Sequence, residues 1–231
     1  MKVFVATPYR DSVTAEYAQS LFYAGRHCSG RGIEVVPNII RNSCFVDIAR
    51  SVLVKTFLES DCTHLLFIDA DIGYESHAIA GLVEAGVPFC AGVYRKREDK
   101  LGFCAQAYEP QEFRGPWMRV TRVATGFMCL ERRVLEEMSK NVPLCNVSRR
   151  GNVPMVFRTN MEGDFIGEDY CFCDDYNKLY EAGVFDQPIW VYPDIIFNHN
   201  GYVGNLYESL THAEGIEKNG SIIMSTTSSE T

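Results

Sequence analysis

The sequence contains no apolar run long enough to cross a membrane. Its first eight residues reach a proline too early for a secretory signal peptide, and they predict a first strand instead. These two absences predict a soluble protein of the cytoplasm, or of the host cytoplasm if the source is a virus. No internal repeat or linker divides the 231 residues, so a single domain is expected.

Positive charge is the scarcer sign. Lys and Arg total 22 against 30 Asp and Glu, which gives a net charge of −8 and an isoelectric point near 5.2. Such a chain offers nucleic acid no broad basic surface, and only a local basic groove stays open as an alternative. A nucleic-acid partner is therefore not expected.

The nine cysteines include no Cys-x-x-Cys pair, and their number is odd. A disulfide framework needs even pairing and a secretory context, so the pattern predicts buried thiols in a reducing compartment. Cys171 and Cys173 are close enough in sequence to reach one metal ion. Zinc sites ordinarily need four ligands in recognisable pairs, which favours a structural role for both.

What the sequence does have is an apolar run that stops at two carboxylates. Residues 65–68 are continuously apolar, as in a central strand covered on both faces, and Asp69 and Asp71 follow where that strand would end. Residues two apart on an extended segment project to the same side, so both carboxylates are expected to converge on one cation, with the small Ala70 between them. The alternative is that both are ordinary turn residues.

Strand and helix patterns alternate along most of the chain, which predicts an α/β fold with a mixed, mainly parallel sheet flanked by helices. Open sheets of this kind bind ligands at the carboxyl ends of their strands, where Asp69 and Asp71 stand. The predicted strands are 2–6, 33–40, 65–68, 87–94, 101–107, 118–130 and 189–196, and the predicted helices are 13–27, 46–59, 77–85, 132–139 and 174–182.

Several polar residues are candidates for binding a ligand. Asp47 and Arg50 are three apart near the start of a predicted helix, so they form either a surface ion pair or part of a nucleotide pocket. The three cations at 95–97 follow a strand, which is typical of a solvated loop or of a site that helps to hold a diphosphate. Gly126 interrupts an apolar strand, where a missing side chain often lets a ligand approach.

Two late features complete the candidate site. Glu168 and Asp169 stand at the expected start of a helix, where carboxylates serve either as caps or as catalytic groups. His199 follows the last strand among polar residues and glycine, which favours a solvent-facing site over the core. Residues 216–231 are polar and rich in Ser and Thr, and they are predicted to be a disordered tail after a domain that covers residues 1–215.

Set side by side, these pieces resemble the small glycosyltransferases of the GT-A fold, a Rossmann-like α/β fold whose members use sugar nucleotides and a divalent cation. The chain is most similar to short inverting, family-two-like enzymes of viral, phage and bacterial type, including the rhamnosyltransferase domain of chloroviruses. The resemblance covers about residues 2–207. The motifs that carry it are Thr7-Pro-Tyr-Arg10, Asp47-Ile-Ala-Arg50, Asp69-Ala-Asp71, Phe89-Cys-Ala-Gly-Val-Tyr94, Ala124-Thr-Gly126, Gly167-Glu-Asp169 and His199.

The resemblance implies a role for each of these residues. Asp69, Asp71 and His199 would hold the metal, and Asp169 would be the catalytic base with Glu168 in a supporting role. Oxygen ligands with one imidazole suit Mn²⁺ or Mg²⁺. The nucleotide-sugar would lie against Thr7, Pro8, Tyr9, Arg10, Asp47, Arg50, Asp69, Ala70, Asp71 and Gly126.

The function implied by the resemblance is transfer of a sugar, with inversion, from a nucleotide-diphosphate donor to an acceptor hydroxyl on a glycan. A UDP-sugar is the favoured donor. One alternative is a nucleotidyltransferase or phosphohydrolase that uses the same carboxylates for metal-assisted phosphoryl chemistry. A second is a glycosyltransferase that acts on a modified phage DNA base, and a third is a non-catalytic sugar-nucleotide or glycan-binding module.

Overall fold

The apolar run before Asp69 forms strand β3 (His64–Ile68), as predicted. Its side chains alternate between two separate cores, with Leu65 and Phe67 in one and Leu66 and Ile68 in the other. All four are fully buried. A strand can be continuously apolar in this way only when both faces of its sheet are covered.

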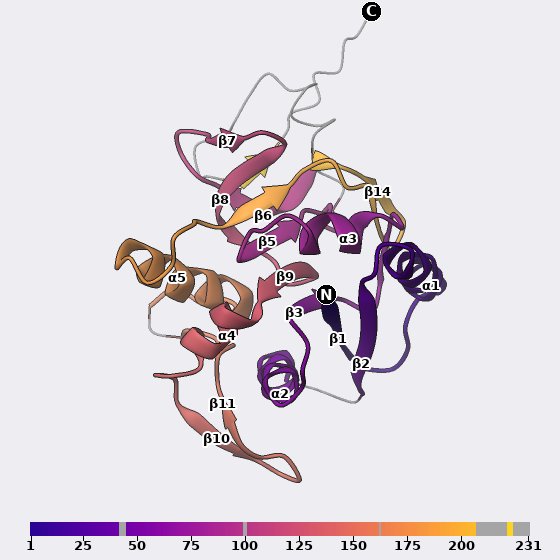
Figure 1. Ribbon diagram of the computed structural model, residues 1–231. Helices are drawn as coiled ribbons and strands as arrows, with labels where there is room; N and C mark the ends of the chain where they lie inside the picture. The colour runs from indigo at the N-terminus through magenta and orange to yellow at the C-terminus, as the bar shows by residue number, and fades with distance from the viewer. Residues whose placement is uncertain (42–44, 99–100, 162, 207–220, 224–231) are drawn as a thin grey trace, which may run out of the picture.

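In the computed structural model, which describes residues 1–41, 45–98, 101–161, 163–206 and 221–223, β3 lies within a ten-stranded sheet (Figure 1). The strand order is β15-β6-β8-β12-β5-β9-β3-β1-β2, with β7 beside β8. The bounds are β1 Lys2–Tyr9, β2 Glu34–Arg41, β5 Phe89–Gly92, β6 Gly102–Ala107, β7 Phe113–Arg114, β8 Trp117–Val123, β9 Phe127–Glu131, β12 Trp190–Tyr192 and β15 Ser221–Ile223.

The sheet is mixed. Strands β1, β2 and β3 are parallel to one another, and so are β5 and β12. Strand β9 joins the two groups by pairing antiparallel with both β3 and β5. The prediction of one strand over residues 118–130 was therefore wrong, because the chain breaks between β8 and β9 and only β9 enters the centre of the sheet.

Two smaller sheets stand beside the large one. Strands β4 (Ile72–Tyr74), β13 (Phe197–His199) and β14 (Tyr202–Gly204) form the first, which carries His199 toward the end of β3. The hairpin of β10 (Leu144–Val147) and β11 (Gly151–Pro154) forms the second.

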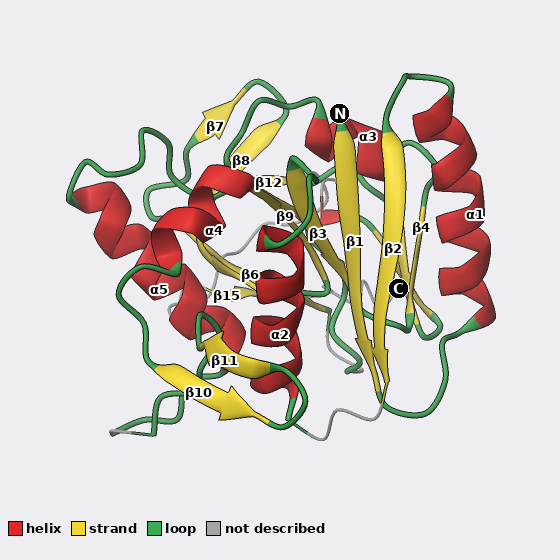
Figure 2. Ribbon diagram, turned by 60° about the horizontal axis from the view of Figure 1, so that its bottom comes forward, coloured by secondary structure: helices red, strands yellow, loops and turns green. Residues whose placement is uncertain are grey.

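Five helices of the described chain cover the two faces of the sheet (Figure 2). Helices α1 (Ala15–Ser29) and α3 (Ala78–Val83) pack on one face. Helices α2 (Val46–Leu58), α4 (Arg132–Met138) and α5 (Glu168–Glu181) pack on the other. None of the helices in these ranges is both long and apolar enough to span a membrane.

Local chemistry explains where the helices begin and end. The Thr14 hydroxyl caps α1 by accepting the N–H of Tyr17 at 3.2 Å, which satisfies one of the free donors of the first turn. Gly183 follows α5 with a φ of +75°, a left-handed conformation that glycine adopts without strain. The structure confirms the predicted α/β fold with a mixed sheet flanked by helices. The sheet is less parallel than predicted, because three of its strand pairs in the described residues are parallel and six are antiparallel.

The cysteines and the tail complete the comparison with the sequence. The eight cysteines within the described residues are free thiols, and most of them, Cys171 and Cys173 included, are buried. Of the predicted tail, residues 216–220 and 224–231 lie outside the described residues. Its remaining residues, Ser221–Ile223, form β15 and pair with β6.

A pair of glycine substitutions tests the packing of the core. A Cβ at Gly92 would lie 2.3 Å from Cζ of Phe197 and 3.1 Å from Cδ1 of Phe127, two rings that are themselves buried. We expect Gly92→Ala to lower the free energy of unfolding by roughly 1–3 kcal/mol through overpacking. The control is Gly81→Ala in α3, where no heavy atom of the described chain outside the local helix backbone lies within 4 Å of the new Cβ, and alanine favours the helix by about 1 kcal/mol.

Denaturant unfolding of both variants measures the difference. Equal stability of Gly92→Ala and Gly81→Ala would contradict the packing described for the Phe127 and Phe197 rings.

Candidate active site

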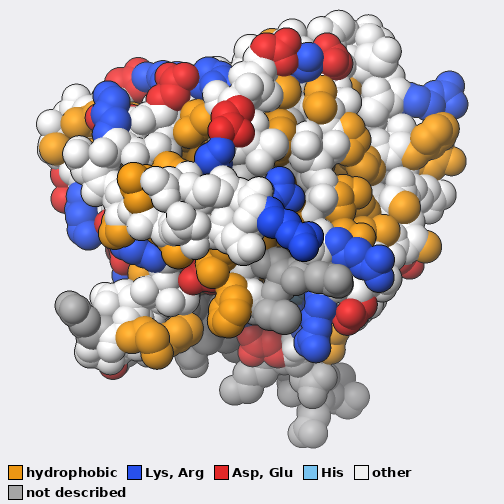
Figure 3. Space-filling view, turned by 90° about the horizontal axis from the view of Figure 1, so that it is seen from below, with side chains coloured by type: hydrophobic (Ala, Val, Ile, Leu, Met, Phe, Trp, Pro, Cys, Tyr) orange, Lys and Arg blue, Asp and Glu red, His pale blue; other side chains and the backbone are white. Residues whose placement is uncertain are grey.

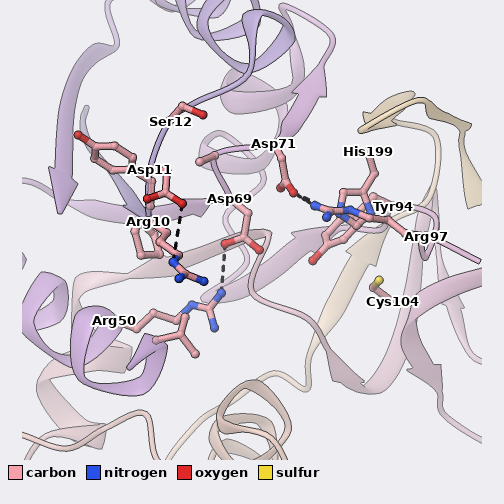
Figure 4. A pocket seen from close by; sticks show the side chains of 14 residues that line it. Arg10, Asp11, Ser12, Arg50, Asp69, Asp71, Tyr94, Arg97, Cys104 and His199 are labelled. Carbon is pink, nitrogen blue, oxygen red and sulfur yellow. Dashed lines mark hydrogen bonds and ion pairs between the residues drawn. The ribbon is translucent and has the colours of Figure 1, made fainter. Parts of the chain in front are cut away.

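A cavity of about 480 Å³ opens at the carboxyl ends of β1 and β3 (Figure 4). Eight residues predicted from the sequence line it. Pro8, Tyr9 and Arg10 come from the end of β1 and the residue after it, Arg50 from α2, Asp69, Ala70 and Asp71 from the segment after β3, and His199 from β13. The cavity is where parallel sheets bind ligands.

Three predicted nucleotide contacts are not among the residues that line the cavity. Thr7 is fully buried, and its hydroxyl lies 2.6 Å from that of Tyr17, so it anchors β1 to α1. Asp47 accepts the N–H of Ile48 at 2.8 Å in the first turn of α2. The third, Gly126, contacts the backbone of Asp69.

The two carboxylates after β3 do not converge as predicted. Ile72 N–H donates to the Asp69 carbonyl at 3.2 Å, which closes a turn over Ala70 and Asp71 and breaks the alternation of an extended strand. Figure 4 shows the result: Asp69 points to Arg50, and Asp71 points away toward Arg97. Each carboxylate has its own arginine.

Arg50 lies at the base of the site and is 5% exposed. It donates to Asp69 Oδ1 at 3.1 Å and forms an ion pair with Glu168, so it is not the surface partner of Asp47. Burial alone would lower the pKa of Arg50, but the charges of Asp69, Glu168 and Asp169 more than reverse this, and its pKa is raised. Among the described residues its buried Nε has no hydrogen-bond partner, which leaves one donor unused.

Arg97 connects the other carboxylate to the histidine. It forms an ion pair with Asp71, and its Nε–H donates to Nε2 of His199 at 2.9 Å. Nδ1 of His199 lies 2.7 Å from the Arg95 carbonyl. Nδ1 therefore carries the proton and Nε2 the lone pair, and burial, together with the charge of Arg97, lowers the pKa of His199.

Gly126 serves packing behind the carboxylates. A Cβ there would lie 2.3 Å from the hydroxyl oxygen of Tyr94, which accepts the Gly126 N–H at 3.2 Å. The Gly126 carbonyl accepts the N–H of Asp69 at 3.0 Å. The space left by the missing side chain is thus filled by Tyr94, and the glycine positions Asp69.

Glu168 and Asp169 begin α5 in different environments. Glu168 is held by Arg50, whereas one carboxylate oxygen of Asp169 accepts the N–H of Tyr170 at 2.8 Å. Burial and then the like charge of Glu168 raise the pKa of Asp169. A carboxylate with a raised pKa is a stronger base than an exposed one, as general-base catalysis requires.

Sequence reasoning missed several residues of the cavity wall. Tyr94 and Cys104 both line the cavity. They are neighbours, because the N–H of Cys104 in β6 donates to the Tyr94 carbonyl at 3.1 Å. Burial raises the pKa of Cys104 to about 12, so it remains a thiol at neutral pH. Asp11 and Ser12 extend the loop after β1. The one sequence signal for Asp11 and Ser12 is that they belong to the loop after a predicted strand.

Three arginines of this acidic protein reach the cavity, each paired with an aspartate that also lines it. Arg10, Arg50 and Arg97 all line the cavity. On the face shown in Figure 3, Lys and Arg side chains gather near the middle. Guanidinium groups at the carboxyl end of a parallel sheet suit a phosphate-bearing ligand, because they make forked hydrogen bonds to its oxygens.

The predicted metal ligands fit a divalent cation in part. Asp71 Oδ2 and the unprotonated Nε2 of His199 are 3.9 Å apart and face the same space, and both are donors that such a cation accepts. Asp69 is directed to Arg50 instead. Within the described ranges, no three His, Cys, Asp or Glu side chains are grouped so that they could hold a metal ion.

The chain was compared with known proteins. No family and no curated protein matches the sequence. Among solved structures, A197 from STIV matches with a TM-score of 0.55 and 18% identity over 86% of this chain and 85% of that one. At this identity the likeness shows the fold. The fold itself agrees with the predicted α/β class, a mixed sheet flanked by helices, with the cavity at the carboxyl ends of parallel strands.

Two further solved structures match with lower TM-scores. One is a glycosyltransferase involved in the glycosylation of the major capsid of PBCV-1, with a TM-score of 0.38 and 10% identity over 83% of this chain and 81% of that one. The other is S. aureus TarS 1-349 in complex with UDP, with a TM-score of 0.46 and 15% identity over 84% of this chain and 58% of that one.

The role of Arg50 in stability can be tested against a matched arginine. Arg50→Ala leaves Asp69 and Glu168 without their buried partner, and loss of one member of a buried pair costs about 3–5 kcal/mol. Because the Asp69 side chain is 31% exposed, we expect a loss near the low end. Arg133 also bridges two carboxylates, but its side chain is 50% exposed, so Arg133→Ala should cost about 0–1 kcal/mol.

Chemical denaturation of the two variants gives the free energies of unfolding. If Arg50→Ala lowers the free energy of unfolding no more than Arg133→Ala does, Arg50 behaves as an exposed ion-pair residue and the buried role described here is wrong.

Proposed function

We propose that this protein is a glycosyltransferase that moves a sugar from a nucleotide-diphosphate donor to an acceptor hydroxyl with inversion. The observation that carries the proposal is one cavity, at the carboxyl ends of parallel strands, with three arginines on its wall and a carboxylate of raised pKa nearby. The arginines suit the diphosphate of a donor, and Asp169 suits the proton of an acceptor. Phosphate binding alone would need no such base.

The donor half of the proposal rests on charge. The diphosphate leaving group gains negative charge as its bond to the sugar breaks, and Arg10 and Arg97 can bind its oxygens. Arg50 is a third arginine on the cavity wall. Pro8 and Tyr9 offer an apolar and aromatic surface to the nucleotide base. A uridine nucleotide is the donor that the family resemblance favours.

Metal dependence is part of the proposal. Asp71 and His199 would hold Mn²⁺ or Mg²⁺, with Asp69 as the third ligand if its carboxylate turns from Arg50. When bound, such an ion acts as a Lewis acid that neutralises charge on the leaving diphosphate. The Arg95 carbonyl fixes the imidazole in the form whose Nε2 carries the lone pair that a cation would bind.

Asp169 acts on the acceptor. It takes the proton of the acceptor hydroxyl while that oxygen forms its bond to the anomeric carbon. The bond from that carbon to the phosphate oxygen breaks on the opposite face, and the nucleoside diphosphate leaves with the electron pair. General-base help of this kind contributes about 10²–10⁴-fold. Glu168 supports the site by holding Arg50 in place.

Products separate this proposal from its alternatives. A glycosyltransferase releases a nucleoside diphosphate together with a glycosylated acceptor, on a glycan as proposed or on a modified DNA base. A nucleotidyltransferase or phosphohydrolase breaks a phosphate bond and leaves the sugar on its phosphate. A binding module turns over nothing, so slow metal-dependent hydrolysis of the donor already distinguishes it from an enzyme.

Donor affinity should depend on a divalent cation. We expect UDP to bind between about 5- and 150-fold more tightly with Mn²⁺ than with EDTA, a typical range for two coupled ligands. Asp71→Asn should reduce that ratio toward one. Asp11→Asn is the matched control, because Asp11 also lines the cavity but its side chain is 83% exposed and paired with Arg10. Calorimetric titration measures both affinities, and equal binding in EDTA would rule out the metal.

The catalytic base should be separable from binding. We expect Asp169→Asn to keep UDP and Mn²⁺ affinity nearly unchanged while transfer falls by about 10²-fold or more, because the amide keeps the shape and loses the basicity. Asp164→Asn, a change of the same type at an exposed residue before α5, should transfer normally.

The pH dependence follows from the raised pKa of Asp169. The base form is lost as pH falls through that pKa, so the rate should decline at a higher pH than an ordinary aspartate, near 3.9, would give. This acid limb should vanish in Asp169→Asn. A normal rate in that variant, or a product with the donor's anomeric configuration by NMR, would falsify the inverting mechanism.

A further inference from the structure

Arg97 stands where two of the proposed metal ligands meet. Its guanidinium is paired with Asp71, and its Nε–H donates to the lone pair of His199 Nε2, the atom that a metal would use. Asp71 and His199 approach each other to 3.9 Å across this group. Figure 4 shows the three side chains together on one side of the cavity, away from Asp69 and Arg50.

The guanidinium and a divalent cation exclude one another. Both need the same carboxylate oxygen and the same ring nitrogen, and like charges a few ångströms apart repel strongly in a partly buried site. A metal can therefore reach Asp71 and His199 only when Arg97 leaves them.

Arg97 is placed so that it can leave. Its side chain is 44% exposed, whereas that of Arg50 is 6% exposed and held by two carboxylates. An ion pair at such exposure contributes little to stability, so exchange of Arg97 for another cation leaves the fold intact. Arg97 also lines the cavity, where a diphosphate would offer it a new anionic partner.

We propose that Arg97 is an exchangeable counter-ion, bound to Asp71 and His199 in the free protein and displaced by the divalent cation when the donor binds. The released guanidinium then contacts the diphosphate. Metal and nucleotide consequently promote each other's binding, since each favours the position of Arg97 that the other needs. This inference rests on the proposed nucleotide-diphosphate donor, and it makes Arg97 a positioning residue that also regulates metal entry.

The test is a titration of Mn²⁺ alone into the full chain, followed by electron paramagnetic resonance of the free ion. Arg97→Ala removes the competitor, so we expect it to bind Mn²⁺ about tenfold more tightly than the unaltered protein in the absence of nucleotide. With UDP present the advantage should shrink or reverse, because the variant has lost a diphosphate contact. Arg97→Gln, which keeps a polar side chain of similar length, should behave as Arg97→Ala does and serves if that variant folds poorly.

Lys96→Ala is the matched control. Lys96 is the neighbouring cation, its side chain is 40% exposed, and it pairs with Glu98 rather than with the metal ligands. Lys96→Ala removes one positive charge from the same segment, as Arg97→Ala does. A gain in Mn²⁺ affinity equal to that of Arg97→Ala would show general charge repulsion and overturn the exchange.

Two further results would also overturn it. One is an Arg97→Ala variant that binds Mn²⁺ no more tightly than the unaltered protein does. The other is UDP binding that is insensitive to Mn²⁺ and lost in Arg97→Ala, which would make Arg97 a permanent substitute for the metal. Failure of the proposed function looks different: Mn²⁺ and UDP would show the expected coupling, but no sugar nucleotide would yield a glycosylated product.

Discussion

A buried guanidinium ties the site together. Arg50 comes from α2, and its two partners stand at the end of β3 and the start of α5, with Glu168 118 residues away in the chain. A buried charge is tolerable only when it is paired, so the three elements must meet in one arrangement. Asp169 follows Glu168 at the start of α5, and its pKa is raised by burial and then by the like charge of Glu168. One arginine thus contacts both Asp69 of the cavity and the residue next to the candidate base.

Much of the fold could be predicted from the sequence because its pattern is local. The apolar residues before Asp69 required a strand covered on both faces, and the turn and helix signals elsewhere required an α/β alternation. The place of β9 could not be predicted. Its pairing with β3 and β5 depends on contacts between segments tens of residues apart, and the predicted strand over residues 118–130 gave no sign of the break.

For the site, the sequence indicated which residues come together better than it indicated which side chains they contact. Pro8, Arg50 and His199, which were predicted to bind the nucleotide or the metal, all line one cavity. The direction of the two carboxylates was missed, because one hydrogen bond from Ile72 to the Asp69 carbonyl turns the chain where alternation was assumed. The pairing of Arg97 was hidden too, since a cation after a strand is most often solvated and its contact with His199 spans 102 residues.

The place of β9 also bears on how the chain comes to be folded during synthesis. In the described sheet, β3 and β5 are joined only through β9, which follows both in the sequence. A nascent chain that ends before β9 therefore leaves the edges of β3 and β5 that will face β9 unpaired, and such edges invite mispairing with other chains. The carbonyl that holds the Asp69 backbone, from Gly126, arrives at the same late moment. During synthesis, the link between β3 and β5 and the backbone contact that holds Asp69 therefore both wait for the segment around β9.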